Sequence, residues 1–162
     1  MKYYWGASII DSYKIFSHVP FNKTDYTIFF YLINLMDNEN NVYIKQSKLS
    51  QELEIDKSNI SRSIEKLKEW QFITKIKSGF MINPSFIYIN KSRDYERNDL
   101  RNIFSKYVIE SGYSDEKLFF EYDEDHKEYR FESFYYGTTD MFDYILKIEK
   151  DIERLKKARL NA

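Results

Sequence analysis

The side chains best suited to chemistry lie at the start of one amphipathic segment, residues 55–73, IDKSNISRSIEKLKEWQFI. If residues 57–70 form a helix, Ile60, Ile64 and Leu67 share its buried face through their i, i+4, i+7 spacing. Serine, asparagine and arginine side chains form a second stripe near the helix start. Arginine can bind guanine and asparagine can bind adenine through two hydrogen bonds. The pattern therefore predicts that this helix end reads bases in a DNA major groove.

We expect eight residues to contact duplex DNA. The side chains at the helix start would reach the bases, Lys66 would bind a phosphate, and the wing lysines would lie against neighbouring phosphates or the minor groove. The set is Lys57, Ser58, Asn59, Ser61, Arg62, Lys66, Lys75 and Lys77. A solvated helix face with a capped start explains any one of these residues equally well. The prediction therefore rests on the whole set in its structural context.

The elements around this helix have the order of a winged helix-turn-helix. The expected elements are a helix over 24–36, a polar turn at 37–41, a strand over 42–44, a helix of about nine residues within 45–55, the helix over 57–70, and a hairpin with strands over 72–77 and 80–82 joined by a tight turn at 78–79. Leu49 and Leu53 would face the core. A helix pair linked by about two residues lets its second helix enter a major groove.

Two residues have the type and position of helix N-caps. Thr24 precedes the first apolar periodic run, and Asp56 precedes Lys57. The carboxylate of Asp56 is expected to accept hydrogen bonds from the first-turn N–H groups of the helix that follows.

The composition removes several kinds of site. The chain has no Cys, and His18 and His126 are its only histidines, so thiolate metal sites, disulfides and His-based triads have little material. No stretch approaches the roughly 18 apolar residues of a membrane span, and residues 1–10 do not have the pattern of a signal peptide. We therefore expect a soluble, cytoplasmic protein. Aromatic residues make up 19% of the chain, including 15 Tyr, many of which must pack in the core with their hydroxyls at the surface.

Charge divides the chain. Residues 1–93 hold 13 Lys and Arg against 9 Asp and Glu, whereas residues 94–162 hold 12 against 17. Such asymmetry suggests two surfaces with different partners. We expect an α+β fold in three parts. These are an aromatic N-terminal arm over 1–22 that includes Tyr3, Tyr4 and Trp5, a winged helix over 23–93, and an acidic module over 94–162 that consists of a helix, a β-hairpin and a terminal helix.

The acidic module is predicted to begin with a helix over 94–109 that has Leu100, Ile103, Phe104 and Tyr107 on one side and stops near Gly112. A hairpin follows around a turn at 123–127. The last helix, capped at 138–140 and running to about 160, carries an apolar stripe formed by Phe142, Ile145, Ile148, Ile152 and Leu155. Its basic end suits the helix dipole.

The hairpin carries the acidic residues Glu121, Asp123, Glu124, Asp125 and Glu128. This cluster is either a solvated, aggregation-resistant sheet edge or a docking surface for a host protein that handles nucleic acid. The terminal helix could equally pair with its twin in a homodimer.

Nothing in the sequence points to catalysis. Asp123, Glu124 and Asp125 could hold Mg²⁺, but carboxylates at a hairpin tip are more often solvated, and no Lys or His supports them. The 4 Gly are too scattered for a phosphate-cradling loop. A tyrosine nucleophile for strand nicking would lack the His-rich metal site that usually accompanies it. We expect no catalytic residue, no cofactor and no metal.

The stretch LSQELEIDKSNISRSIEKLKEWQFITKIKSGFMINPSFIYINK, residues 49–91, resembles the winged helix region of the RepL-type plasmid replication proteins of low-GC bacteria. The helix pair resembles many winged helix regulators, whereas SGFMINPSFIY, with Asn-Pro after the second wing strand, is more typical of this family. The resemblance covers about residues 23–91. In two respects the chain departs from it, because Trp70-Gln71 stands where glycine is common and residues 94–162 have no recognised counterpart.

The resemblance implies binding to the protein's own origin and initiation of plasmid or mobile-element replication through recruited host enzymes. It carries over to the DNA-reading helix, residues 57–62, and to the wing lysines. Two alternatives stay open. One is a transcriptional regulator on the same scaffold. The other is a phage or mobile-element inhibitor whose acidic half blocks a nucleic-acid enzyme.

Overall fold

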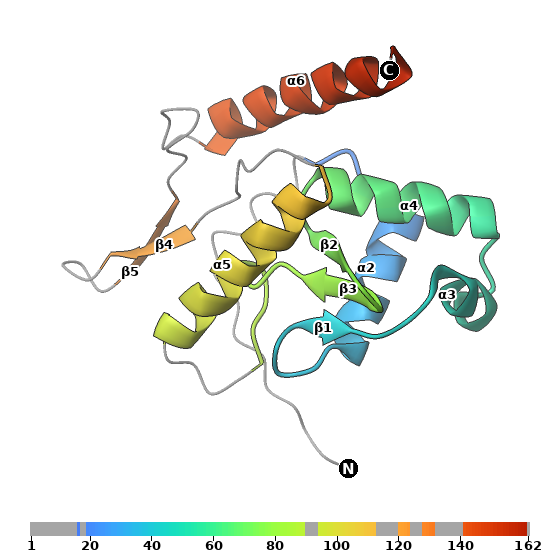
Figure 1. Ribbon diagram of the computed structural model, residues 1–162, viewed down its shortest axis with the longest axis horizontal. Helices are drawn as coiled ribbons and strands as arrows, with labels where there is room; N and C mark the ends of the chain where they lie inside the picture. Colours follow the sequence, from blue (N-terminus) through green and yellow to red (C-terminus); the bar gives the residue numbers. More distant parts are fainter. Residues whose placement is uncertain are drawn as a thin grey trace.

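The computed structural model describes residues 16, 19–89, 94–112, 120–123, 128–131 and 141–161 (Figure 1). Its elements are α2 (Lys23–Leu35), β1 (Asn41–Val42), α3 (Gln46–Leu53), α4 (Lys57–Glu69), β2 (Ile73–Ile76), β3 (Gly79–Ile82), α5 (Asp94–Glu110), β4 (Phe120–Asp123), β5 (Glu128–Phe131) and α6 (Met141–Leu160). Helices combined with a small antiparallel sheet, in this order, confirm the α+β, winged-helix-like fold expected from the sequence. Tyr3, Tyr4 and Trp5 lie outside the described residues.

The small sheet has the strand order β1-β3-β2, and both pairings are antiparallel. Val42 lies opposite Phe80, and Ile76 lies opposite Gly79. The hairpin turn therefore falls on 77–78 rather than on the expected 78–79, and Gly79 is already the first residue of β3. The expected first strand is also shorter than predicted, because it ends at Val42.

Gly79 is required because β3 passes very close to β1. A Cβ at this position would lie 1.9 Å from the carbonyl oxygen of Val42 and 3.0 Å from the Cα of Tyr43, and both neighbours are backbone atoms that cannot turn away. We therefore expect Gly79→Ala to lower the free energy of unfolding by about 1–3 kcal/mol. Urea denaturation followed by circular dichroism measures this loss. Ser78→Ala, in the exposed turn, is the control, and an equal loss in both variants would contradict the steric argument.

The main core fills the space between the helices and the sheet. Seven apolar residues of α2, α3 and α4 are at most 1% exposed, namely Ile28, Phe29, Leu32, Leu49, Ile60, Ile64 and Leu67. This confirms the buried stripe expected for α4. Aromatic rings close the core, because Phe72 contacts Phe86 with 4.3 Å between ring centroids and Phe16 packs on both rings. The end of the expected N-terminal arm thus packs on the core.

The two expected N-caps have different outcomes. Thr24 is not the cap of α2, because Asn22, two residues earlier, is the N-cap and forms a reciprocal capping box with Asp25. The Asn22 side chain accepts from the Asp25 N–H at 3.0 Å, and Asp25 accepts from the Asn22 N–H at 2.8 Å. Asp56 does stand at the N-cap of α4, but its side chain makes no capping hydrogen bond. The prediction for Asp56 was right in position and wrong in the bond.

The turn after α4 has Gln71 at a position where glycine is common. Gln71 has φ of +58°, the left-handed conformation in which glycine is common after a helix. Asn83, from the Asn-Pro that follows the wing, stabilises this turn. Its side-chain amide donates to the Gln71 carbonyl at 2.8 Å, and its backbone N–H donates to the Phe72 carbonyl at 2.9 Å. Asn83 therefore links the end of the wing to the end of α4 through two hydrogen bonds.

Helix α5 packs on the sheet of the winged helix. Phe104 and Val108 of α5 form a second small core with Ile76 and Met81 of the sheet. Ile103, expected on the inward side of α5, is instead 44% exposed. The division at residue 93 stays a prediction, although α5 packs on β2.

The predicted secondary structure of the C-terminal part is present where the structure describes the chain. α5 ends at Glu110, just before Gly112, whose φ is +77°. β4 and β5 form the expected antiparallel hairpin, with Glu121 opposite Arg130. On α6, Ile152 contacts the main core, and Leu155 is half-buried. The caps at 138–140, the hairpin turn at 124–127, and the side chains of Phe142, Ile145 and Ile148 lie outside the described residues.

Candidate nucleic-acid interface

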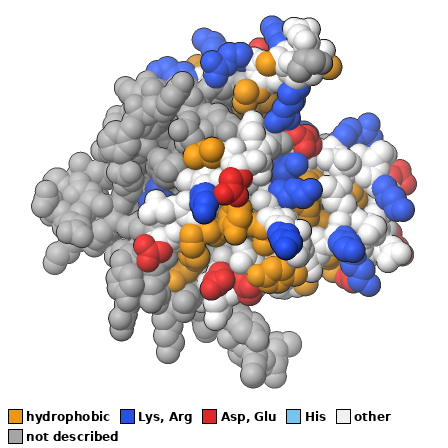
Figure 2. Space-filling view, in the orientation of Figure 1, with side chains coloured by type: hydrophobic (Ala, Val, Ile, Leu, Met, Phe, Trp, Pro, Cys, Tyr) orange, Lys and Arg blue, Asp and Glu red, His pale blue; other side chains and the backbone are white. Residues whose placement is uncertain are grey.

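The outer face of α4 is open to solvent along its first two turns. Lys57, Ser58, Ser61 and Arg62 are exposed there, and Asn59 is half-buried toward one side. In Figure 2, Lys and Arg side chains gather over α4, α3 and the wing in the right half of the view. The structure therefore brings the predicted base-reading residues together on one exposed helix end. Their contact with DNA stays a prediction.

Arg62 is already oriented in this protein. Its guanidinium donates from Nη2 to the side-chain oxygen of Asn59, one turn earlier on α4. Such an i, i+3 contact limits the rotamers of a long side chain. A guanidinium that is partly ordered before binding loses less conformational entropy when it binds a base.

The two wing lysines lie beside this helix. Lys75 is exposed in β2. Lys77 is also exposed, but it lies in the turn rather than in the strand where the sequence suggested it.

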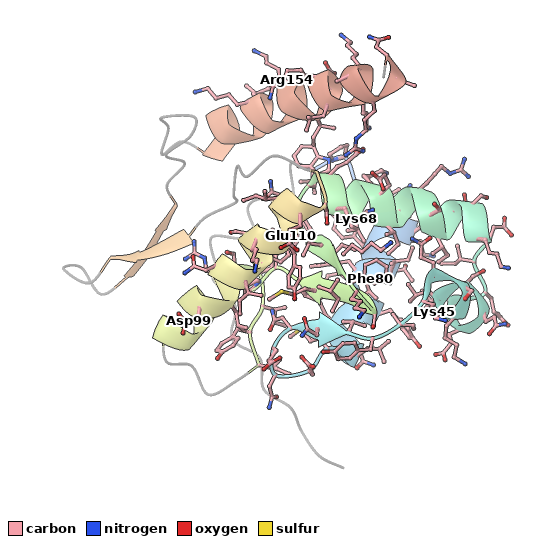
Figure 3. All side chains as sticks on the ribbon, viewed as in Figure 1. Lys45, Lys68, Phe80, Asp99, Glu110 and Arg154 are labelled. Carbon is pink, nitrogen blue, oxygen red and sulfur yellow. The ribbon has the colours of Figure 1, made fainter. Side chains whose placement is uncertain are left out.

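A basic pocket of about 360 Å³ lies between α4, the wing and the start of α3. Four lysines line it, and none of its described lining residues is acidic. They are Lys45, Lys68, Lys75 and Lys77. Three of the lining residues are labelled in Figure 3, namely Lys45 just before α3, Lys68 on α4 and Phe80 on β3. Sequence reasoning missed Lys45 and Lys68. They lie outside the wing, and only the folding of the chain brings them together with the wing lysines.

Lys66 has a partner within the protein. Its ammonium donates to Oδ2 of Asp25 on α2 at 2.7 Å, and the Asp25 side chain is only 1% exposed. The structure thus gives Lys66 a role in holding α4 against α2. A phosphate contact by Lys66 stays a prediction.

The Asp25 carboxylate accepts hydrogen bonds from three residues, two of them in α4. Besides Lys66, it accepts from the hydroxyl of Ser63 at 2.6 Å and from the backbone N–H of Asn22 at 2.8 Å. Burial raises the pKa of Asp25, but the hydrogen bonds from Lys66, Ser63 and Asn22 outweigh it and hold this pKa below its usual range. Asp25 is therefore an ionised, buried link between α2 and α4.

The structure describes only some of the acidic residues that were predicted to form a docking surface. Glu121, Asp123 and Glu128 stand in the β4–β5 hairpin, with Asp123 opposite Glu128, while Glu124 and Asp125 fall outside the described residues. Their side chains are not described, so the docking surface stays a prediction. Within the described parts of the chain, no three His, Cys, Asp or Glu side chains converge as metal ligands do. No helix there combines the length and the apolar character that crossing a membrane requires.

A comparison with protein families gives one match. The model of the Firmicute plasmid replication protein family, RepL, matches residues 17–126. No curated protein and no solved structure matches the chain. The family match is longer than the resemblance over 23–91, because it also takes in α5 and β4. The chain therefore belongs to the RepL family of Firmicute plasmid replication proteins.

Proposed function

We propose that this protein binds duplex DNA sequence-specifically through α4 and the wing, and that it starts plasmid or mobile-element replication from the site it binds. One observation carries the proposal. In a chain of a plasmid replication family, the second helix of a tight pair exposes Ser58, Ser61 and Arg62 at its start. In helix-turn-helix proteins this helix end contacts base edges.

The lysines around α4 would hold the DNA backbone. The start of α4 enters the major groove, and the basic pocket between α4, the wing and α3 takes a phosphate of one strand. Lys75 and Lys77 then give affinity without sequence preference, whereas Arg62 and Asn59 give specificity. We propose a binding role without catalysis, in which strand opening and synthesis are the work of recruited host enzymes.

We expect Lys75→Ala and Lys77→Ala each to reduce the dependence of DNA affinity on salt. Each phosphate contact contributes a slope of about 0.9 in log Kobs against log salt, so each variant should lose about one unit of slope. Fluorescence anisotropy with a random-sequence duplex measures it. The control is Lys106→Ala, at an exposed position of α5, which should keep the wild-type slope. Failure of the folded wild-type protein to bind at low salt would overturn the DNA proposal.

Replication and transcription can be separated by the site the protein selects and by what its loss changes. A variant that no longer binds should lower plasmid copy number if the protein is an initiator. Changed transcript levels at an unchanged copy number would instead favour a regulator. Capture of a host nucleic-acid enzyme that is lost on charge reversal of Glu121, Asp123 and Glu128, while DNA binding survives, would favour the inhibitor alternative.

A further inference from the structure

Two carboxylates share the face of α4 that would meet DNA. Glu65 and Glu69 continue the line of Ser58 and Arg62 with i, i+4, i+7, i+11 spacing, so all four lie along one side of the helix. Phosphates approaching this face would meet two negative charges within two turns of Arg62. Left unpaired, these carboxylates would oppose the binding that the lysines favour.

The terminal helix forms an ion pair with each of them. Nη1 of Arg159 lies 3.2 Å from Oε1 of Glu65, and Nζ of Lys156 lies 3.2 Å from Oε2 of Glu69. Glu69 depends most on this contact, because its side chain is only 9% exposed. Glu65 has a second cation, Lys68, at 3.0 Å on its other carboxylate oxygen.

These contacts come from one face of α6. Ile152, which packs on the main core, precedes Lys156 and Arg159 with i, i+4, i+7 spacing. The order of the pairs runs in opposite directions on the two helices, so α6 lies antiparallel to α4, beside its C-terminal half (Figure 1). The pairs begin one turn beyond Arg62. α6 therefore neutralises Glu65 and Glu69 and leaves the N-terminal end of α4 accessible.

We infer that α6 is an electrostatic clip that neutralises Glu65 and Glu69 on the recognition helix and thereby sets the affinity of the protein for duplex DNA. The inference rests on the proposed DNA binding of α4. It assigns that binding a determinant outside the winged helix and also beyond the family-matched residues, which end at 126. Lys156 and Arg159 act here as positioning and neutralising residues that make no contact with DNA.

The test uses the full chain with Lys156→Ala and Arg159→Ala combined. Uncovering the carboxylates should cancel about one phosphate contact, which lowers the salt slope by about one unit and weakens binding roughly 8-fold at 0.1 M salt. Lys156→Ala alone should account for most of the loss, because Lys68 still pairs with Glu65. Circular dichroism confirms that each variant keeps its helices before binding is measured by anisotropy.

Two further variants separate neutralisation from simple loss of positive charge. Lys150→Ala with Lys157→Ala removes two exposed cations from the opposite face of α6, and it should bind as the wild type does. Adding Glu65→Gln and Glu69→Gln to the Lys156/Arg159 variant should restore wild-type binding, because no charge is left to neutralise.

The outcomes distinguish the two proposals. Wild-type protein that does not bind DNA overturns both. If the wild type binds DNA and the Lys156/Arg159 variant binds equally well, only the proposal about α6 is overturned. An equal loss in the Lys150/Lys157 variant, or no rescue by the glutamines, also overturns the clip and would instead favour direct DNA contact by α6.

Discussion

Arg62→Ala is expected to weaken binding to the preferred DNA sequence by about 1–3 kcal/mol, or roughly 5- to 150-fold in Kd. Arg62 is exposed in the N-terminal half of α4 and is oriented by Asn59. A guanidinium bound to guanine makes two hydrogen bonds that a wrong base cannot replace. The preferred sequence would be selected from a random duplex pool with the wild-type protein, and both Kd values would be measured on it.

Arg62→Lys is the matched control. It keeps the positive charge and loses the planar pair of donors, so it should lose preference for the selected sequence while keeping the salt slope of the wild type. Alanine should reduce both. Arg62 does not read a base if both variants keep the wild-type ratio of Kd for the random duplex to Kd for the selected duplex.

Asp25→Ala is expected to lower the free energy of unfolding by about 3–5 kcal/mol at pH 7, the usual loss when one partner of a buried ion pair is removed. The Asp25 side chain is 1% exposed, and without it the ammonium of Lys66 and the hydroxyl of Ser63 lose their acceptor. The capping box of α2 also loses its second half. Urea denaturation measures the change. Lys66→Met should also lower the free energy of unfolding. If the two residues act as a pair, Asp25→Asn combined with Lys66→Met should lose less stability than the sum of the two single substitutions.

The carboxylate of Asp25 should also make the free energy of unfolding depend on pH in the acid range. The pKa of Asp25 is lowered in the folded protein, so its contribution is complete above the unfolded value of about 3.9 and is lost as pH falls through the folded pKa. Wild type should therefore lose stability below about pH 4, whereas Asp25→Asn should lack this part of the fall. Parallel curves for the two proteins between pH 7 and pH 3 would contradict the assignment.

The local part of this structure was predictable from the sequence. Apolar spacing in residues 57–70 predicted α4 and its buried Ile60, Ile64 and Leu67, because helical periodicity is a property of a single segment. The order of helix pair and hairpin predicted the winged helix, and its quoted motifs suggested the family that the comparison then confirmed. Exposure of Ser58 and Arg62 also followed, since a helix with one buried stripe presents the opposite side to solvent.

Only the tertiary structure decided which groups meet. Ser63 and Lys66 reach Asp25 across 38 and 41 residues of sequence, and Arg159 reaches Glu65 across 94. The residues lining the basic pocket are likewise gathered from α3, α4 and the wing. A single sequence records periodicity along the chain, but the pairing of charges between distant helices depends on how those helices pack. Lys66 and Arg159 look alike in the sequence, as cations on amphipathic helices. Packing makes Lys66 a partner of the buried Asp25 carboxylate and brings Arg159 to Glu65 of α4.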